Sequence, residues 1–154
     1  TVDTIPDLLT MIPPVAVARV GIVGFAYDPG GAIDRGFRYD PEKRRVHDIE
    51  LPADLVRAAI PALSPDGRHV AYVGRTDDGR VRAVVRVWPR GRIVAAGPPV
   101  VPRGSGRADA ALWTSPDSFQ VQMEIGRAPE RFLIVDGTLT GGITSVDTMI
   151  VTGG

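Results

Sequence analysis

Short apolar runs separated by turn-forming residues make up most of the chain. In the first third, three runs rich in Val, Ile, Phe and Tyr cover residues 16–27, 32–39 and 45–51. Asp28-Pro29-Gly30-Gly31 and Asp40-Pro41-Glu42-Lys43 separate them, and the third run alternates polar with apolar residues. Because such runs bounded by Gly, Pro and Asp are typical of strands and hairpins, this third predicts three antiparallel strands.

The middle third has the clearest pattern, with four apolar runs in close succession. Thr76-Asp77-Asp78-Gly79 forms a tight turn between the second and third runs. Pro98-Pro99 ends the pattern, since proline cannot donate a hydrogen bond to a central strand pair. The pattern predicts four antiparallel strands at residues 60–63, 68–74, 80–88 and 92–96.

The last third repeats this order after a loose linker, residues 103–107. A turn is expected at residues 126–130, between the second and third of four predicted strands. Helix is expected only as short turns at residues 4–10 and 52–58, because isolated segments of this length do not form stable helices. The prediction is an all-β chain whose last strands lie at residues 110–113, 119–125, 131–135 and 146–151.

One strand-turn-strand phrase occurs twice, at residues 63–72 and 114–123. Ser, Pro, Asp and a following Val recur at one offset of 51 residues, with Ser64-Pro65-Asp66 matching Ser115-Pro116-Asp117. Proline presets the backbone angle of such a turn and the Asp carboxylate can bond its backbone amides. A fixed offset indicates a repeat architecture, and Asp66 and Asp117 are expected to be structural turn residues.

The phrase at residues 63–72 resembles the blade signature of TolB-like and related WD-repeat-like β-propellers. The resemblance is good over that blade, fair over residues 110–136 and weak over residues 16–51. It implies a single all-β domain over residues 1–154, a partial β-propeller of about three antiparallel four-stranded blades. Their approximate limits are residues 14–51, 59–102 and 108–151.

Propellers usually close with four to eight blades, so about three blades leave the ring open. Either the chain is part of a longer propeller, or two copies complete one ring as a homodimer. In the dimer, the contact is expected between residues 17–25 of one copy and residues 132–151 of the other. The apolar tail 148–151 is then a candidate for a closing strand that crosses between the copies.

Composition supports one globular domain and argues against nucleic acid or a membrane as its partner. The chain has 154 residues, 44% of them hydrophobic and 23% charged. Eighteen basic and eighteen acidic residues give a net charge of zero, which disfavours binding to nucleic acid. No apolar run approaches 18 residues, so no membrane span is expected. The absence of cysteine excludes disulfides, thiolate metal sites and a cysteine nucleophile.

The resemblance and the start of the chain bear on its origin. TolB-like propellers occur in bacterial lipoproteins and as periplasmic scaffolds, which implies a bacterial protein and favours a periplasmic or secreted location over a cytoplasmic one. The chain begins at Thr1 without a leader segment. A processed product, including one that has lost a secretory signal, is one expectation, and a chosen boundary is the other.

The residues do not form a recognisable catalytic constellation. His47 and His69 are the only histidines and have no nearby carboxylate cluster in the sequence, so they do not predict a metal site. No serine lies in a Gly-x-Ser-x-Gly elbow, and the loop around Ser105 leads into a strand rather than a phosphate-binding helix. We therefore expect no catalytic residues, no cofactor and no metal, and predict that the chain is not an enzyme.

Five residues are candidates for binding a partner. Arg80, Arg82 and Arg86 alternate with apolar residues and should share one face of a strand. A solvated face is the simpler interpretation, and an anionic partner or a subunit contact is the functional one. Trp88 and Trp113 lie at strand ends, where filling the wedge between neighbouring blades is favoured over anchoring an interface.

The sequence leads to two hypotheses of different classes. The first is a non-catalytic binding or scaffold module of β-propeller type that interacts with a protein or a ligand. The alternative is a propeller fragment of a prolyl-oligopeptidase-like serine hydrolase, implied by the resemblance because propellers of this family also precede such hydrolase domains.

Overall fold

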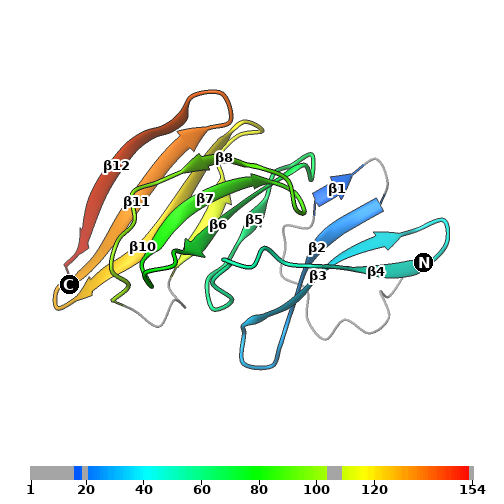
Figure 1. Ribbon diagram of the computed structural model, residues 1–154, viewed down its shortest axis with the longest axis horizontal. Helices are drawn as coiled ribbons and strands as arrows, with labels where there is room; N and C mark the ends of the chain where they lie inside the picture. Colours follow the sequence, from blue (N-terminus) through cyan, green and yellow to red (C-terminus); the bar gives the residue numbers. More distant parts are fainter. Residues whose placement is uncertain (1–15, 19–20, 104–108, 153–154) are drawn as a thin grey trace.

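Three antiparallel sheets account for the regular structure of the chain. A computed structural model describes residues 16–18, 21–103 and 109–152, and these contain strands, turns and loops but no helix. The expected all-β class is confirmed. The three sheets lie one after another along the molecule (Figure 1), and each has four strands in chain order.

The first sheet comprises β1 (Ala16–Ala18), β2 (Gly21–Tyr27), β3 (Ile33–Asp40) and β4 (Arg45–Ile49). The second comprises β5 (Ala62–Leu63), β6 (His69–Arg75), β7 (Val81–Val87) and β8 (Ile93–Ala96). The third comprises β9 (Ala110–Trp113), β10 (Ser118–Arg127), β11 (Glu130–Thr138) and β12 (Gly142–Val151).

The first sheet has one strand more than its hydrophobic pattern predicts. The run at 16–27 divides into β1 and β2, which pair antiparallel with Ala18 opposite Gly21. A run of this length exceeds the typical strand of about 5–6 residues, so it can fold back on itself. Residues 4–10, where a helical turn is expected, lie outside the described residues, and residues 52–58 form turns and a single bridge between Leu55 and Gly74.

The third sheet is longer than predicted because its strands continue through polar residues. The β10–β11 hairpin closes at Ala128-Pro129 instead of the broader turn expected at 126–130. Gln120 Nε2 donates to Asp136 Oδ1 (2.9 Å), and Ser145 Oγ donates to Asp136 Oδ2 (3.2 Å), joining β10, β11 and β12 on one face. These cross-strand bonds extend the ladder where the apolar pattern stops.

The second sheet is buried on both faces because its neighbours pack against opposite sides. Val70, Tyr72 and Val84 belong to a cluster with residues of the first sheet, including Phe25. The residues that alternate with them belong to a cluster with the third sheet, which contains Ala71, Val73, Val81, Ala83, Val85, Phe119, Val121, Met123 and Val135. β6 and β7 are therefore apolar at nearly every position, as expected for a sheet between two others.

The inner edges of the second and third sheets are tied by direct hydrogen bonds. The amide of Ile60 donates to the carbonyl of Asp109 (2.9 Å), and the amide of Ala111 donates to the carbonyl of Ile60 (2.8 Å). The indole Nε1 of Trp113 donates to the carbonyl of Ala62 (2.9 Å). The sheets thus converge along β5 and β9.

The two Ser-Pro-Asp turns are built by their own side chains. Asp66 Oδ1 accepts hydrogen bonds from Ser64 Oγ (2.6 Å) and from the amide of Arg68 (3.0 Å), which confirms the expected backbone bond. Burial opposes ionisation of Asp66, but these bonds and nearby positive charge outweigh it and lower its pKa. Asp117 differs from the expectation, because its Oδ1 accepts from Ser115 Oγ (2.7 Å) and Ser118 Oγ (3.3 Å). The Ser115 hydroxyl provides the backbone bond there, accepting from the Ser118 amide (3.1 Å).

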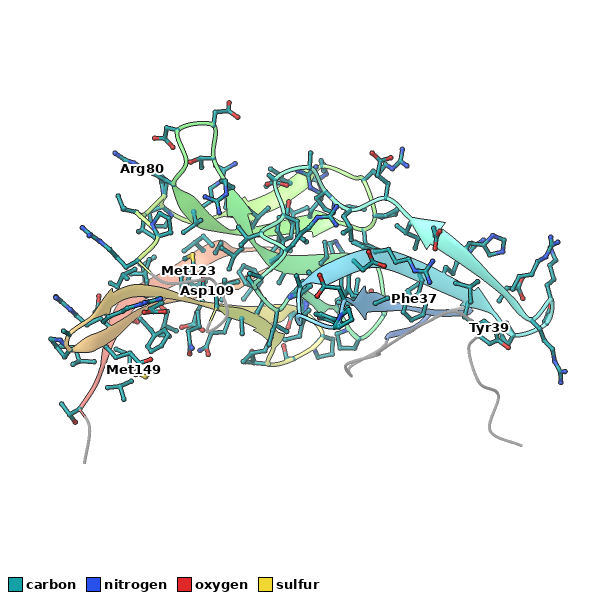
Figure 2. The ribbon with its side chains drawn as sticks, turned by 90° about the horizontal axis from the view of Figure 1, so that it is seen from below. Phe37, Tyr39, Arg80, Asp109, Met123 and Met149 are labelled. Atoms are coloured by element: carbon teal, nitrogen blue, oxygen red, sulfur yellow. The ribbon has the colours of Figure 1, made fainter. Side chains whose placement is uncertain are left out.

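The outer faces of the two end sheets differ in exposure. Phe37 and Tyr39 of β3 alternate with residues that face the second sheet, yet they are 0% and 3% exposed. Leu112 and Met149 lie on the outer face of the third sheet and are 44% and 42% exposed. Figure 2 labels Phe37, Tyr39 and Met149 at opposite ends of the molecule.

Candidate functional site

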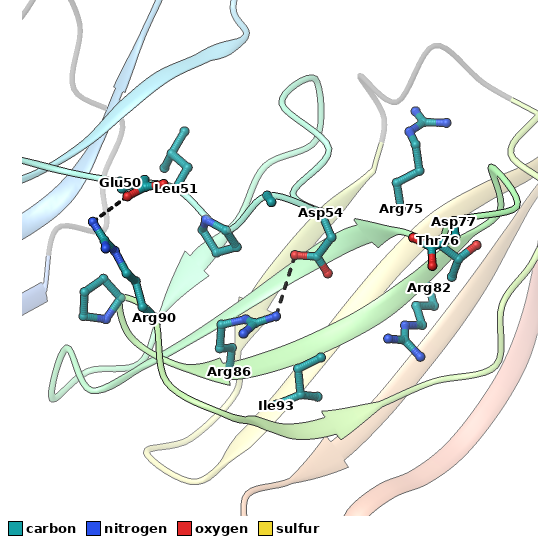
Figure 3. A pocket seen from close by; sticks show the side chains of 13 residues that line it. Glu50, Leu51, Asp54, Arg75, Thr76, Asp77, Arg82, Arg86, Arg90 and Ile93 are labelled. Atoms are coloured by element: carbon teal, nitrogen blue, oxygen red, sulfur yellow. Dashed lines mark ion pairs between the residues drawn. The ribbon is translucent and has the colours of Figure 1, made fainter.

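A pocket of about 650 Å³ lies between the connector after β4 and the face of β6, β7 and β8 (Figure 3). Four arginines line it, namely Arg75, Arg82, Arg86 and Arg90. Three carboxylates, Glu50, Asp54 and Asp77, share the same walls. This concentration of charge beside Leu51 and Ile93 makes the pocket the strongest candidate site among the described residues.

Strand alternation and the connector backbone together position the polar groups. Arg82 and Arg86 emerge from β7 on the side of the first sheet, with Val84 buried between them. The connector follows the edge of β6, since the amide of Arg75 donates to the carbonyl of Asp54 (2.7 Å). Asp54 is thereby brought opposite Arg86.

Asp54, Tyr72 and Arg86 form a connected hydrogen-bond group. The Tyr72 hydroxyl donates to Asp54 Oδ1 (2.8 Å) and accepts from Arg86 Nε (3.1 Å). Arg86 Nη1 donates to the carbonyl of Gly91 (2.9 Å), and its Nη2 lies 3.9 Å from Asp54 Oδ1. Burial raises the pKa of Tyr72, which therefore keeps its proton and donates to Asp54 at neutral pH.

Gly74 gives Asp54 the space it occupies. A Cβ atom at position 74 would lie 2.8 Å from Asp54 Oδ2 and 2.8 Å from Val84 Cγ2. Any larger residue would therefore push against both the connector and β7. The close approach of connector and sheet that forms this wall requires glycine here.

The remaining charges of the pocket are not all neutralised. Arg90 pairs with Glu50 at the rim, where both side chains are largely exposed, so the pair contributes little to stability. The guanidinium groups of Arg75 and Arg82 have no hydrogen-bond or ion-pair partner among the described residues. Among the described residues, two guanidinium groups of the pocket and one carboxylate, that of Asp77, thus have no hydrogen-bond or ion-pair partner.

The structure separates the three arginines expected to share one face. Arg82 and Arg86 both line the pocket, but Arg80 precedes β7 and lies in the β6–β7 hairpin (Figure 2). There its Nε is 3.3 Å from Asp78 Oδ2. The strand begins one residue later than predicted, at Val81, and Arg80 lies beside Asp78 in the turn. The binding of a partner by these arginines stays a prediction.

Both tryptophans fill spaces between sheets. Trp88 is 8% exposed and packs edge-on against Phe25 of the first sheet, with ring centroids 5.1 Å apart. Trp113 packs against Phe119, with ring centroids 5.9 Å apart, and bonds the carbonyl of Ala62 in the second sheet. Both indole rings thus contact a neighbouring sheet, and a wedge between propeller blades stays an interpretation.

Sequence reasoning missed several residues of the pocket. Asp54 and Glu50 lie in a connector without periodicity, Arg75 is the last residue of β6, and Arg90 lies in the turn between β7 and β8. The close approach of Asp54 to Tyr72 depends on how the connector folds along β6, which no local pattern indicates. The one available signal was Gly74 inside an apolar strand, since glycine there marks close packing.

A second polar group lies between β9 and β10, away from this pocket. Asp109 is 5% exposed, and its Oδ1 accepts from the amide of Glu124 (2.7 Å). Glu124 Oε1 accepts from Arg127 Nε (3.0 Å). Burial and the nearby negative charge of Glu124 raise the pKa of Asp109, although the Glu124 amide opposes the effect.

Other site types have no counterpart in the described part of the chain. No group of three or more His, Asp or Glu side chains is arranged there to hold a metal ion. Within residues 16–18, 21–103 and 109–152, no helix is long and apolar enough to cross a membrane.

Comparison of the chain with protein-family models, with curated proteins and with solved structures gave no match. The TolB-like resemblance therefore rests on the Ser-Pro-Asp phrases alone.

Proposed function

We propose that this chain is a non-catalytic binding or scaffold module of β-propeller type. The stacking of the second sheet between two others, with inner edges tied at Ile60 and Ala110, supports a propeller-like arc. In such an arc each sheet packs against its neighbours, and an end sheet retains one face for a partner.

The open outer face of the third sheet carries this proposal. Leu112, Met149 and Val151 present exposed apolar side chains there, and β12 is the edge strand of its sheet. Exposed apolar surface on a sheet face favours contact with a further protein surface. The partner we propose is a second copy of the chain.

The first sheet contributes less to this contact than its sequence suggests. Val23 and Phe25, inside the contact range expected for a dimer, are buried in the cluster with the second sheet. The outer residues Phe37 and Tyr39 are also buried. We therefore place the contact on the third sheet, within the predicted range 132–151 and extended to Leu112.

Solution mass tests this proposal. At micromolar concentration, sedimentation should give twice the 16.4 kDa chain mass. Met149→Glu should weaken dimerisation at least tenfold, because it removes apolar burial of about 1.5–3 kcal/mol and adds a charge. Val101→Glu, at an exposed residue outside the third sheet, is the control and should leave the mass unchanged. A wild-type monomer, or equal effects of the two variants, would refute the proposed contact.

A further inference from the structure

We propose that the arginine-lined pocket binds a carboxylate-bearing ligand whose aliphatic part lies on Ile93. Arg82 is the residue that would hold the carboxylate. This site is separate from the outer face of the third sheet and does not depend on dimerisation.

The pairing of charges inside the pocket identifies the binding groups. Arg86 uses Nε for Tyr72 and Nη1 for Gly91, so it builds the wall. Arg82 extends from the same strand face without any partner among the described residues. A guanidinium presents parallel N–H donors that match a carboxylate, which makes Arg82 the primary ligand contact.

The position of Arg82 in the sheet places it beside the Asp54 wall. Its cross-strand neighbour is Gly74, and the Asp54 carboxylate lies over that glycine. Arg82 is half-buried, so its stem is held by the strand while its donors reach the pocket. Figure 3 shows Arg82 on β7 with its guanidinium directed toward Ile93, whereas the guanidinium of Arg75, at the end of β6, is directed to the other side.

The balance of charge favours a monoanion over a phosphate. Two pocket arginines are neutralised by Glu50 and Asp54, and Asp77 opposes one of the remaining two. The net charge left is one positive unit, which suits a single carboxylate. The two negative charges of a phosphate dianion would be repelled by the three carboxylates that line the pocket, which would weaken its binding.

The shape of the pocket indicates the rest of the ligand. Its volume of about 650 Å³ falls within the range typical of small-molecule sites. Ile93 is 37% exposed on the wall near Arg82 (Figure 3). An aliphatic group would cover Ile93 while the carboxylate reaches Arg82. A free branched-chain acid and the C-terminus of a peptide ending in an aliphatic residue both have this chemistry.

Titration of the full chain with small carboxylates tests the site. We would follow amide NMR shifts and calorimetric heat with 3-methylbutanoate and, separately, with N-acetyl-alanyl-leucine, up to about 10 mM so that millimolar affinities are measured. Saturable binding with shifts at pocket residues is expected for at least one of them. If 3-methylbutanoate binds more tightly, the natural ligand is a free acid. If N-acetyl-alanyl-leucine binds more tightly, the ligand is the C-terminus of a peptide.

Matched variants assign the binding to the Arg82 guanidinium. Arg82→Gln should weaken binding at least tenfold, with a melting curve confirming that the variant folds. Arg80→Gln, in the hairpin outside the pocket, should bind like the unmodified chain. Leu112→Glu should also bind normally, so a failure of the dimer proposal remains distinguishable from a failure here.

Four results would overturn the site. These are no saturable binding by either carboxylate, equal binding of the uncharged 3-methylbutanamide, tighter binding of inorganic phosphate, and a loss with Arg80→Gln equal to that with Arg82→Gln.

Discussion

Residues of one type take different roles here according to the backbone that carries them. Arg80, Arg82 and Arg86 are separated by even numbers of residues, yet Arg80 pairs with Asp78 in a turn while Arg86 is fixed by Tyr72 and Gly91. Of the three, Arg82 lines the pocket with a guanidinium that has no hydrogen-bond or ion-pair partner among the described residues. Alternation predicts the face of a strand residue, but where the strand begins decides whether the rule applies.

Asp109 allows a prediction at the scale of one carboxylate. Burial and Glu124 raise its pKa, so the folded state holds its proton more tightly than the unfolded chain does. Its ionised form therefore costs stability at neutral pH, and this cost disappears as the pH falls through the raised folded-state pKa. Asp109→Asn keeps an oxygen for the Glu124 amide and removes the charge, so it should raise the melting temperature by a few degrees at pH 7.

Melting curves from pH 7 to pH 3 check the sign of this effect. The difference between Asp109→Asn and the unmodified chain should shrink toward zero as Asp109 becomes protonated. Asp117→Asn is the control, because the pKa of that carboxyl is lowered by the Ser115 and Ser118 hydroxyls. Its ionised form stabilises the fold, so the control should lower the melting temperature at pH 7. A destabilising Asp109→Asn would contradict the assigned role of burial.

At the scale of elements, the packing of the connector on β6 builds the pocket wall. Gly74→Ala would place a methyl group 2.8 Å from Asp54 Oδ2 and from Val84 Cγ2. Because β6 and β7 are packed on both faces, the strain should cost about 1–3 kcal/mol and displace Asp54. Denaturant unfolding would measure the cost. Gly30→Ala, whose nearest neighbour is the exposed Asp28 carboxylate, should cost far less, and equal losses would show that Gly74 is not special.

Element type followed from the sequence more reliably than element limits. The predicted runs at 110–113 and 92–96 match β9 and β8 closely, because apolar alternation ends at prolines or charged turns. β12 begins at Gly142 instead of 146, since Asp136 and Ser145 continue the ladder through polar contacts. The pocket could not be predicted in the same way, because Asp54 meets Arg86 only after the connector folds back along β6.

At the scale of the molecule, the three sheets are linked by two different kinds of interface. The first and second sheets meet through an apolar cluster in which Trp88 packs on Phe25. The second and third meet through a larger apolar cluster and through the Ile60 and Trp113 hydrogen bonds at their inner edges. The second and third sheets should therefore behave as one cooperative unit.

Trp113→Phe tests that coupling. It removes the indole donor to the Ala62 carbonyl, which should cost about 1 kcal/mol. Because the bond joins two sheets, amide hydrogen exchange should accelerate in β5 as well as in β9. Trp88→Phe is the matched control, since Trp88 Nε1 has no hydrogen-bond partner and its ring faces the first sheet. That control should instead increase exchange in β2 and β7. If Trp113→Phe affects only β9 and its own sheet, the inner-edge bond does not couple the sheets, and their stacking rests on the apolar cluster alone.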